Sequence, residues 1–333
     1  MPRFLLRRLL VVVPTTFAAI PLLFVLFFLL PGDPARTIAG GDLDNVDPDV
    51  LARVEERYGL DDPVPVQFAR YWERTVQWDL GESYTTRRPV NEIVGDRLAN
   101  TVRLAFWAVV LEVVVGVGAG VVSSVWRRSR TDRATTLLTA AAAAIPVFVL
   151  GYLLKWAFAI YPATHAWPDW LRLRSQGLGP DTWALFVLPT GEQWRYVVLP
   201  AVTLALTSAA LLARITRSSM LDVLRADFVR TARAKGLSER RVVFGHALPN
   251  ALLPVVTIVG LDLGALIGSA VMTETVFSWP GVGSEIARSV ARRDMPVLLG
   301  LTIVVVLAYQ LLNLVVDVSY GRLDPRVRVR ARR

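Results

Sequence analysis

Long apolar stretches alternate with short charged segments along this chain, and the alternation predicts a protein that crosses a membrane several times. A helix needs about 20 apolar residues to cross a hydrocarbon layer roughly 30 Å thick. Six stretches are long enough: 9–30, 104–126, 134–160, 196–213, 250–277 and 295–316. The first has no charged residue and is longer than the apolar part of a secretory signal peptide, so we interpret it as a membrane helix that is not cleaved.

Charged residues are divided unequally between the segments that join these stretches. If the N-terminus is inside, 21 basic and 5 acidic residues lie in the inner segments 1–8, 127–133, 214–249 and 319–333. The outer segments then hold 14 basic and 19 acidic residues in 31–97, 161–195 and 278–294. Because basic residues are enriched in cytoplasmic loops, both termini are predicted to be cytoplasmic. The expected fold class is an all-α, multi-pass membrane protein with six transmembrane helices.

The same pattern divides the chain into four parts. An N-terminal cytoplasmic tail and the first transmembrane helix occupy 1–30, and an extracytoplasmic helical segment follows over 31–97. A core of five membrane helices covers 98–318 and includes the cytoplasmic loop 214–249, and a basic cytoplasmic tail covers 319–333. The outer segment 161–195 is long and rich in Trp, which is typical of a membrane interface.

Composition disfavours several kinds of site. The chain has 333 residues, 53% of them hydrophobic, with no Cys and two His, so a disulfide framework, a thiolate metal site and a His-rich metal centre are not expected. The basic inner surface explains the net charge of +9, so no nucleic-acid partner is expected, whereas the basic tail can contact anionic lipid. The chain has no Gly-x-x-x-x-Gly-Lys-Ser/Thr motif, so we expect neither an ATPase site nor a cofactor bound by it.

Glycines recur at helical spacing within two of the apolar stretches. Gly260, Gly264 and Gly268 follow one another at intervals of four, so they share one helix face and predict close helix packing. Gly116 and Gly120 repeat the pattern in the second stretch. These glycines predict a bundle of several helices without indicating what the bundle does.

Two acidic residues of the fifth stretch, Asp262 and Glu274, are candidates for lining a translocation path. A carboxylate in the middle of a membrane costs about 2.5 to 3.5 kcal/mol on insertion scales, so Asp262 should face protein or a water-filled path. A hydrogen bond between helices explains Asp262 equally well, and Glu274 lies near the end of its stretch, where solvent can reach it. A proton-coupled secondary carrier would use such acids directly, but its usual broken helices and repeated halves are not apparent.

The inner segment after the fourth stretch has the pattern of a short amphipathic helix. The positions that recur at intervals of three and four, with mixed polarity, are Val223, Ala226 or Asp227, Arg230 and Ala234, and Gly236 then ends the helix. Ser238 is placed to cap the next helix. A charged loop that merely follows the rule for cytoplasmic segments would explain the same residues.

This inner segment resembles the cytoplasmic loop of ABC-importer permeases, in which a short helix docks onto the ATP-binding subunit. The matching residues are Ala232, Gly236, Leu248 and Pro249. The general pattern of the family has Glu-Ala-Ala before the Gly, and these positions here read Arg230, Thr231 and Ala232. That departure is the form usual in the peptide-permease branch.

Further stretches resemble the B-type permease of dipeptide and oligopeptide importers, in the same order along the chain. They are Leu30–Pro34, Trp78–Ser83 with Arg88–Val90, Glu274–Gly283, and Asn313–Asp317 with Leu323–Arg326. Taken singly, the prolines and glycines in these stretches are helix stops. Together the matches cover nearly the whole chain, and the weakest part is 162–195.

The resemblance implies a type I ABC-importer permease fold in a bacterial inner or plasma membrane. It implies a second, C-type permease subunit, two ATP-binding subunits or a fused one that hold ATP and Mg, and an extracytoplasmic substrate-binding protein. Dipeptides or oligopeptides are the expected cargo, and nickel complexes, glutathione or haem are alternatives because the binding protein selects the substrate. The residues implied as the contact with the ATP-binding subunit are Asp227, Phe228, Arg230, Thr231, Ala232, Arg233, Lys235, Gly236 and Leu237.

Overall fold

The computed structural model describes residues 48–165, 167–169, 172–180 and 183–323, together with 10, 14–15, 17–25 and 35. In these ranges the structure is mainly helical, which confirms the predicted fold class. Five helices among the described residues are long and apolar enough to cross a membrane: Val90–Val125, Val147–Thr164, Trp194–Val223, Glu239–Leu266 and Met295–Val316. The predicted first span, 9–30, lies mostly outside the described residues, and its described part 17–25 is helical.

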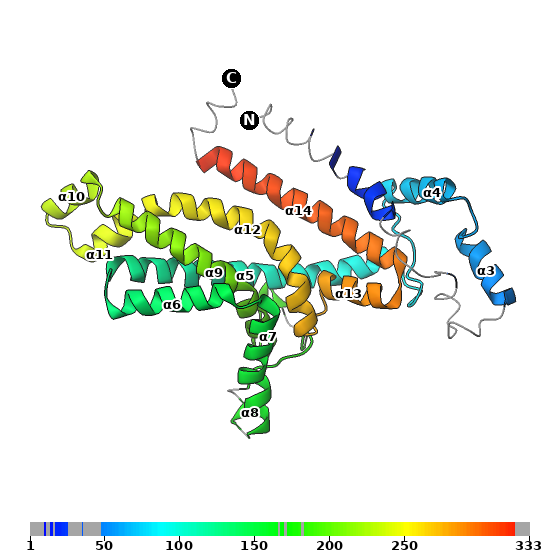
Figure 1. The fold of residues 1–333 in the computed structure, drawn as a ribbon, viewed down its shortest axis with the longest axis horizontal. Coiled ribbons are helices and arrows are strands. Elements are labelled where there is room, and N and C mark those ends of the chain that lie inside the picture. The colour runs from blue at the N-terminus through cyan, green and yellow to red at the C-terminus, as the bar shows by residue number, and fades with distance from the viewer. Residues whose placement is uncertain are drawn as a thin grey trace. The chain divides into compact units, whose positions relative to one another are not determined.

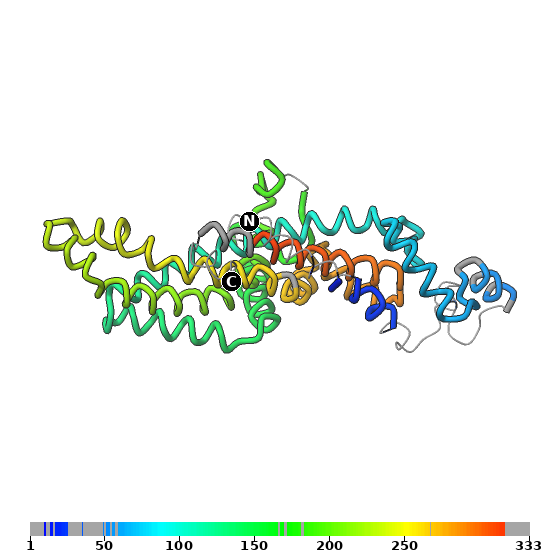
Figure 2. The backbone as a smooth tube through the Cα atoms, turned by 90° about the horizontal axis from the view of Figure 1, so that it is seen from above, coloured from blue at the N-terminus to red at the C-terminus, as the bar shows by residue number. Residues whose placement is uncertain are grey.

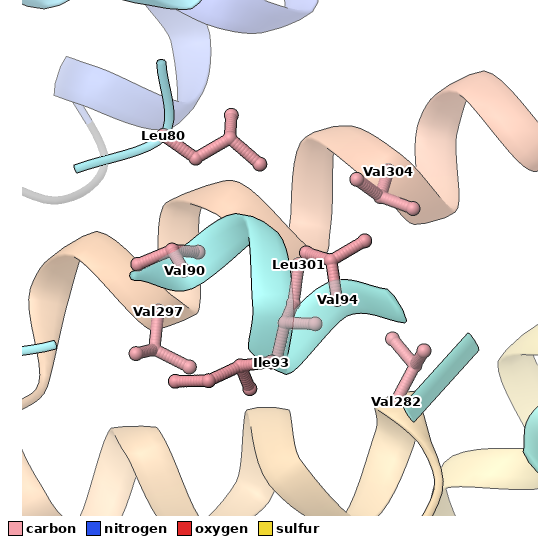
Figure 3. Packing of buried hydrophobic residues seen from close by; sticks show 8 residues of the cluster. All are labelled: Leu80, Val90, Ile93, Val94, Val282, Val297, Leu301 and Val304. Atoms are coloured by element: carbon pink, nitrogen blue, oxygen red, sulfur yellow. The ribbon is translucent and has the colours of Figure 1, made fainter. Parts of the chain in front are cut away.

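The chain forms two compact units, Met1–Asn100 with Gly281–Arg333, and Thr101–Pro280. The first unit contains α3 (Pro48–Tyr58), α4 (Val64–Val76), the first turns of α5 (Val90–Val125), α13 (Val282–Arg292) and α14 (Met295–Leu323). Its core is a cluster of aliphatic side chains from α5, α13, α14 and the loop before α5 (Figure 3): Leu80, Val90, Ile93, Val94, Val282, Val297, Leu301 and Val304.

Two residues explain why the loop before α5 packs onto α14. A Cβ on Gly300 would lie 2.7 Å from Val90 Cγ1, so only Gly allows the two helices to approach this closely. The buried carboxylate of Asp294 accepts hydrogen bonds from the Ser83 hydroxyl at 2.5 Å and from the backbone N–H groups of Tyr84 and Thr85 at 3.1 and 3.2 Å. These contacts fix the stretch that ends at Ser83.

Aromatic side chains join α4 to the described part of the first predicted span. Phe24 stacks on Tyr71 with ring centroids 5.5 Å apart and meets Phe68 edge-on at 5.2 Å. Phe17 lies 5.4 Å from Trp72. Segment 31–97 was predicted to be helical, and α3 and α4 lie within it.

The second unit is a helical bundle built around α9 (Trp194–Val223). Beside α9 lie the rest of α5, α6 (Arg130–Ala144) and α12 (Leu248–Val276) (Figure 1). Leu104, Leu204 and Leu266, which come from α5, α9 and α12, are almost fully buried in a shared cluster. Two further buried clusters of this unit also contain residues of the shorter helical segments that flank these helices.

The connections of the second unit differ at the two ends of α9. After α9 the chain forms α10 (Asp227–Ala234), α11 (Glu239–Arg241) and the π-helix η3 (Val242–Ala247), which protrude at one end of the bundle (Figures 1 and 2). Before α9 the chain runs through α7 (Val147–Lys155), the π-helix η1 (Trp156–Ile160), α8 (Tyr161–Thr164) and a hairpin of β1 (Trp183–Ala184) and β2 (Leu188–Pro189).

The third predicted span, 134–160, is not one helix. α6 ends at Ala144 and α7 begins at Val147, and Ile145 between them is extended (φ −85°, ψ 126°). Proline disfavours a helical conformation for the residue before it, so Pro146 explains the break. The apolar helix long enough to cross a membrane runs over Val147–Thr164 instead, further along the chain than predicted.

Candidate functional site

The loop between α9 and α12 is the segment that the sequence identified, and its helix α10 ends where predicted. Gly236 follows α10 with a left-handed backbone (φ 78°). Its N–H donates to the Arg233 carbonyl at 2.9 Å, and the N–H of Leu237 donates to the Ala232 carbonyl at 3.4 Å. This is a Schellman motif, for which Gly is the favoured residue because other residues rarely adopt that backbone conformation. Ser238 precedes α11 as predicted, but its hydroxyl makes no capping hydrogen bond.

A small apolar core lies beneath α10. Val229 and Ala232 are buried and pack in one cluster with Met220 of α9, Val242 of η3 and Val121 of α5. Ala232 is only 6% exposed, so its side chain contributes to the loop's own core. Its contact with the ATP-binding subunit stays a prediction.

The other predicted contact residues face outward, with one partial exception. Leu237 is half-buried against the same core. The exposed residues are Asp227, Phe228, Arg230, Thr231, Arg233, Lys235 and Gly236. Phe228 is the apolar member of this group and is 45% exposed. Phe228, Thr231 and Lys235 are three and four residues apart, so they share one face of the loop's helix.

Two ion pairs connect charged side chains of the loop, and they differ in how exposed they are to solvent. Arg233 forms a two-pronged pair with Glu239, with Nη2–Oε1 at 2.6 Å and Nε–Oε2 at 3.1 Å. Since Glu239 begins α11, this pair ties the end of α10 to the next helix. Asp227 and Arg230 also pair, but both side chains are highly exposed, so this second pair contributes little to stability.

The π-helix η3 leads from the loop into α12. Pro249 has no N–H to donate to the carbonyl four residues earlier, and its ring crowds a regular helical turn, which the wider π-turn accommodates. Asn250 Nδ2 donates to the His246 carbonyl at 2.7 Å and pairs that backbone group. The π-turn and Pro249 therefore join the loop to α12, a long membrane helix, without ending that helix.

An ion pair at the base of the loop, with a buried aspartate and a partly exposed arginine, was not anticipated from the sequence. The Asp132 carboxylate accepts hydrogen bonds from Arg217 Nε at 2.9 Å and Nη2 at 3.0 Å. It also accepts from the Ser123 hydroxyl and from the Arg128 N–H, the latter at 2.9 Å. Hydrogen bonds from Arg217, Ser123 and the Arg128 backbone hold the pKa of Asp132 well below its usual range. Asp132 is the only acidic residue in the basic segment 127–133, which was the available signal.

The predicted glycine packing holds in the second span. A Cβ on Gly120 would lie 2.5 Å from Thr216 Cβ, and one on Gly116 would lie 2.8 Å from Leu212 Cβ, so α5 and α9 are in backbone contact. We call the line of contacts at Gly116 and Gly120 the α5–α9 seam. The Asp132–Arg217 pair lies just beyond the inner end of the α5–α9 seam. There Arg217 of α9 also donates a hydrogen bond to the Ser123 hydroxyl of α5 at 2.9 Å.

The three glycines of α12 differ in burial among the described residues. Gly260 and Gly264 are buried, whereas Gly268 is exposed. A Cβ on Gly268 would meet nothing within 4 Å among the described residues. The expectation of close packing at Gly268 is therefore not met by any described helix of the chain itself.

The two acids proposed for a translocation path lie in different surroundings. Glu274 is fully buried, and its Oε1 accepts a hydrogen bond from Thr101 Oγ1 at 2.7 Å. Glu274 is therefore enclosed by residues of this chain, and its place on a translocation path stays a prediction. Asp262 is half-buried and lies beside the buried Glu112 of α5. In this structure it therefore takes part in a contact between α12 and α5.

Comparison with known proteins identifies the family of this chain. The family model described as binding-protein-dependent transport system inner membrane component matches residues 113–329, and the model of its N-terminal part matches residues 1–105. The chain belongs to this family of permeases. The glutathione transport system permease protein GsiC of Salmonella paratyphi A is 40% identical over 330 residues, which cover 98% of this chain and 99% of that protein. The protein of the same name from Escherichia coli K12 is 39% identical over the same shares.

Membership in this family confirms several predictions about the permease. It is a membrane component of an ABC importer, located in a bacterial inner membrane, and not the ATPase of that importer. Among solved structures, a chain of the MetNI methionine ABC transporter in an inward-facing conformation is 18% identical, with a TM-score of 0.53. The match covers 70% of this chain and 96% of that one and supports the permease fold.

Proposed function

We propose that this permease forms the membrane path of an ATP-driven importer for glutathione or for short peptides of similar size. The observation that carries the proposal is the identity of 40% with a glutathione permease over almost the full length of both proteins. Glutathione is itself a short peptide, so this cargo lies within the wider expectation of peptide import. Longer oligopeptides, nickel complexes and haem are the alternatives that an uptake experiment must separate.

The importer would contain three kinds of partner around this chain. A second permease subunit would share the translocation path, and a substrate-binding protein would deliver cargo from outside. Two ATP-binding subunits, or a fused one, would hold ATP and Mg on the cytoplasmic side. Family membership in a binding-protein-dependent system supports this composition, as does the absence of a phosphate-binding loop motif from the sequence.

Helix α10 would receive the ATP-binding subunit. Its outer face offers Phe228 as an apolar contact, with Thr231 and Lys235 on the same side. Its inner face, Val229 and Ala232, packs on residues from α5, α9 and η3, so a movement of α10 would be transmitted to these helices. ATP binding to the partner would then shift the permease between inward- and outward-facing states, because the ligand favours one of the two.

An uptake assay tests the cargo. The complete transporter is expressed in a bacterial strain that lacks its own glutathione and peptide importers, and isotope-labelled glutathione is supplied outside. Accumulation should saturate, should require ATP, and should fall when unlabelled glutathione is added in excess. Accumulation of a labelled hexapeptide, a nickel chelate or haem without any glutathione uptake would contradict the proposed cargo and support the corresponding alternative.

Paired substitutions test the docking role of α10. Phe228→Ala should lower both uptake and the ATPase activity that substrate stimulates, because it removes an apolar contact at the surface of α10. Phe244→Ala is the matched control, since Phe244 is 56% exposed but belongs to η3. Membrane content of both variants is measured by immunoblot. Equal loss of activity in the two variants would contradict a contact centred on α10.

A glycine pair tests whether the end of α10 matters for coupling. Gly236→Ala forces a side chain into a left-handed backbone position, although nothing lies within 4 Å of the new Cβ. Gly245→Ala is the control, because Gly245 is helical and its new Cβ would only reach Arg241 Cγ at 3.9 Å. Gly236→Ala should reduce the amount of cargo imported per ATP hydrolysed, while Gly245→Ala should leave that ratio unchanged.

A further inference from the structure

The outer segment 161–195 contains a hairpin that the proposed function does not use. In this hairpin β1 and β2 pair antiparallel, with Trp183 opposite Pro189. The chain reverses at Leu185 and Phe186, and both have left-handed backbone conformations, with φ of 47° and 65°. Gly, Asn or Asp usually occupy such turn positions, because a left-handed conformation is disfavoured for bulky residues. Two apolar residues therefore stand where turn chemistry favours small or polar ones.

Two side chains of α5 hold the backbone of this turn. Arg103 Nε donates to the Phe186 carbonyl at 2.9 Å, and Trp107 Nε1 donates to the Val187 carbonyl at 2.7 Å. The guanidinium of Arg103 also lies over the rings of Trp183 and Phe186, at 4.7 and 5.0 Å from their centroids. The turn is thus attached to α5, and two of its carbonyl groups already have a hydrogen-bond donor within the protein.

The tip of the hairpin presents apolar side chains outward. Leu185 is 84% exposed, Phe186 is 51% exposed and Leu188 is 39% exposed. A turn in water gains nothing from such residues, whereas a lipid layer accepts them if nearby backbone polar groups are already paired. The exposure of the tip and the paired carbonyls of the turn point to the same surroundings.

The position of the hairpin along α5 indicates how deep the hairpin lies in the membrane. Its inner end, Val125, is followed by the basic residues Arg127 and Arg128 at the cytoplasmic surface. Counting outward from there, about 20 helical residues cross a hydrocarbon layer of roughly 30 Å. The outer boundary of that layer then falls between Arg103 and Trp107, the two residues that hold the turn. Trp is enriched at that boundary, and Arg can extend to the lipid headgroups.

We propose that the hairpin tip, Leu185 and Phe186, inserts into the outer leaflet of the membrane at the border between headgroups and acyl chains. The partner is the phospholipid layer itself. Held by Arg103 and Trp107, the tip would fix this part of α5 at a set depth while the loop between α9 and α12 moves.

Spin labelling tests the position of the tip, since the chain has no Cys and Leu185→Cys is therefore its single labelling site. The complete transporter carrying this variant is labelled with a nitroxide and placed in nanodiscs of phosphatidylethanolamine and phosphatidylglycerol. Collisions of the label with oxygen, which concentrates in acyl chains, and with a water-soluble nickel chelate are then measured. The transporter with unmodified permease gives the background from partner subunits. Glu192→Cys is the aqueous control, because the Glu192 side chain is 59% exposed in the same outer segment.

The proposal expects more oxygen collisions and fewer nickel collisions at position 185 than at 192, with no change when the substrate-binding protein is added. Nickel access equal to that of the control would place the tip in water and overturn the proposal. Shielding from both reagents, or shielding that appears only with the binding protein, would place the tip against protein and overturn it too. If Leu185→Cys fails to assemble, Leu188→Cys is judged by the same criteria. These results do not depend on transport, so they leave the proposed cargo untouched.

Discussion

Replacing Asp132 by Ala is expected to destabilise the permease much more than replacing Asp227, although each aspartate pairs with an arginine. Asp132 is buried and accepts hydrogen bonds from both prongs of Arg217, from the Ser123 hydroxyl and from a backbone N–H. Asp227 lies on the surface of α10, where its side chain is 86% exposed and that of its partner Arg230 is 80% exposed. The two substitutions are chemically identical and differ in burial, so each serves as the control for the other.

The magnitude follows from what each substitution leaves behind. Removing one partner of a fully buried ion pair costs about 3 to 5 kcal/mol, because the remaining charge has no counterpart. The Arg217 side chain is 34% exposed, so water can hydrate the stranded guanidinium and the cost should be nearer about 2 to 3 kcal/mol. An exposed pair contributes about 0 to 1 kcal/mol. The expected gap between the two variants is therefore about 2 kcal/mol.

Unfolding of the purified permease by SDS in mixed micelles, followed through Trp fluorescence, measures this gap. The double variant Asp132→Ala/Arg217→Ala should lose less than the sum of the two single variants, because it leaves no unpaired charge. Equal losses for Asp132→Ala and Asp227→Ala would refute the reasoning, since burial would then have no effect. Strict additivity in the double variant would show that the two side chains do not interact.

Three further predictions concern pH, packing and the extracytoplasmic loop. Arg217 and Ser123 hold the pKa of Asp132 below the ordinary value of about 4, so the stabilisation of the folded permease by Asp132 should be complete above pH 4 and disappear as pH falls further. A difference in unfolding free energy between wild type and Asp132→Asn that stays constant in acid would contradict this. Gly120→Ala should cost about 1 to 3 kcal/mol in the SDS assay, because its Cβ would lie 2.5 Å from Thr216 Cβ, and Gly118→Ala, with nothing within 4 Å, should be neutral. Asp294→Ala should speed tryptic cleavage after Arg87, because Ser83, Tyr84 and Thr85 lose their acceptor. An unchanged rate would mean that Asp294 does not hold the loop.

Most membrane helices of this permease could be located from the sequence because a membrane leaves the backbone few choices. An apolar stretch in a bilayer must pair its own N–H and C=O groups, so its length and its charged ends predict a helix directly. α9, α12 and α14 each contain nearly all of the stretch predicted for them. The prediction was wrong at 134–160, where hydropathy alone joined two helices and the local effect of Pro146 separates them.

Contacts between distant residues could not be predicted in the same way. Asp132 and Arg217 are 85 positions apart, and no pattern in one sequence pairs them. The buried face of α10 depends equally on distant partners: Val229 and Ala232 are covered because η3, α9 and α5 lie beneath them. Family motifs indicated which loop matters, but only the packing separates Phe228, which faces outward, from Ala232, which does not.

The arrangement at the base of the loop explains how a contact at α10 could reach the membrane helices. Val229 and Ala232 share one buried cluster with residues of α5, α9 and η3, so α10 cannot shift outward without opening that core. The α5–α9 seam holds these two helices in close contact, because at Gly120 even a Cβ would clash. Just beyond the seam, Asp132 and Arg217 tie the start of α6 to α9. If α10 receives the ATP-binding subunit, as we propose, the inner ends of α5, α6 and α9 should therefore move as one body, and the π-turn of η3 is the irregular joint through which α12 follows.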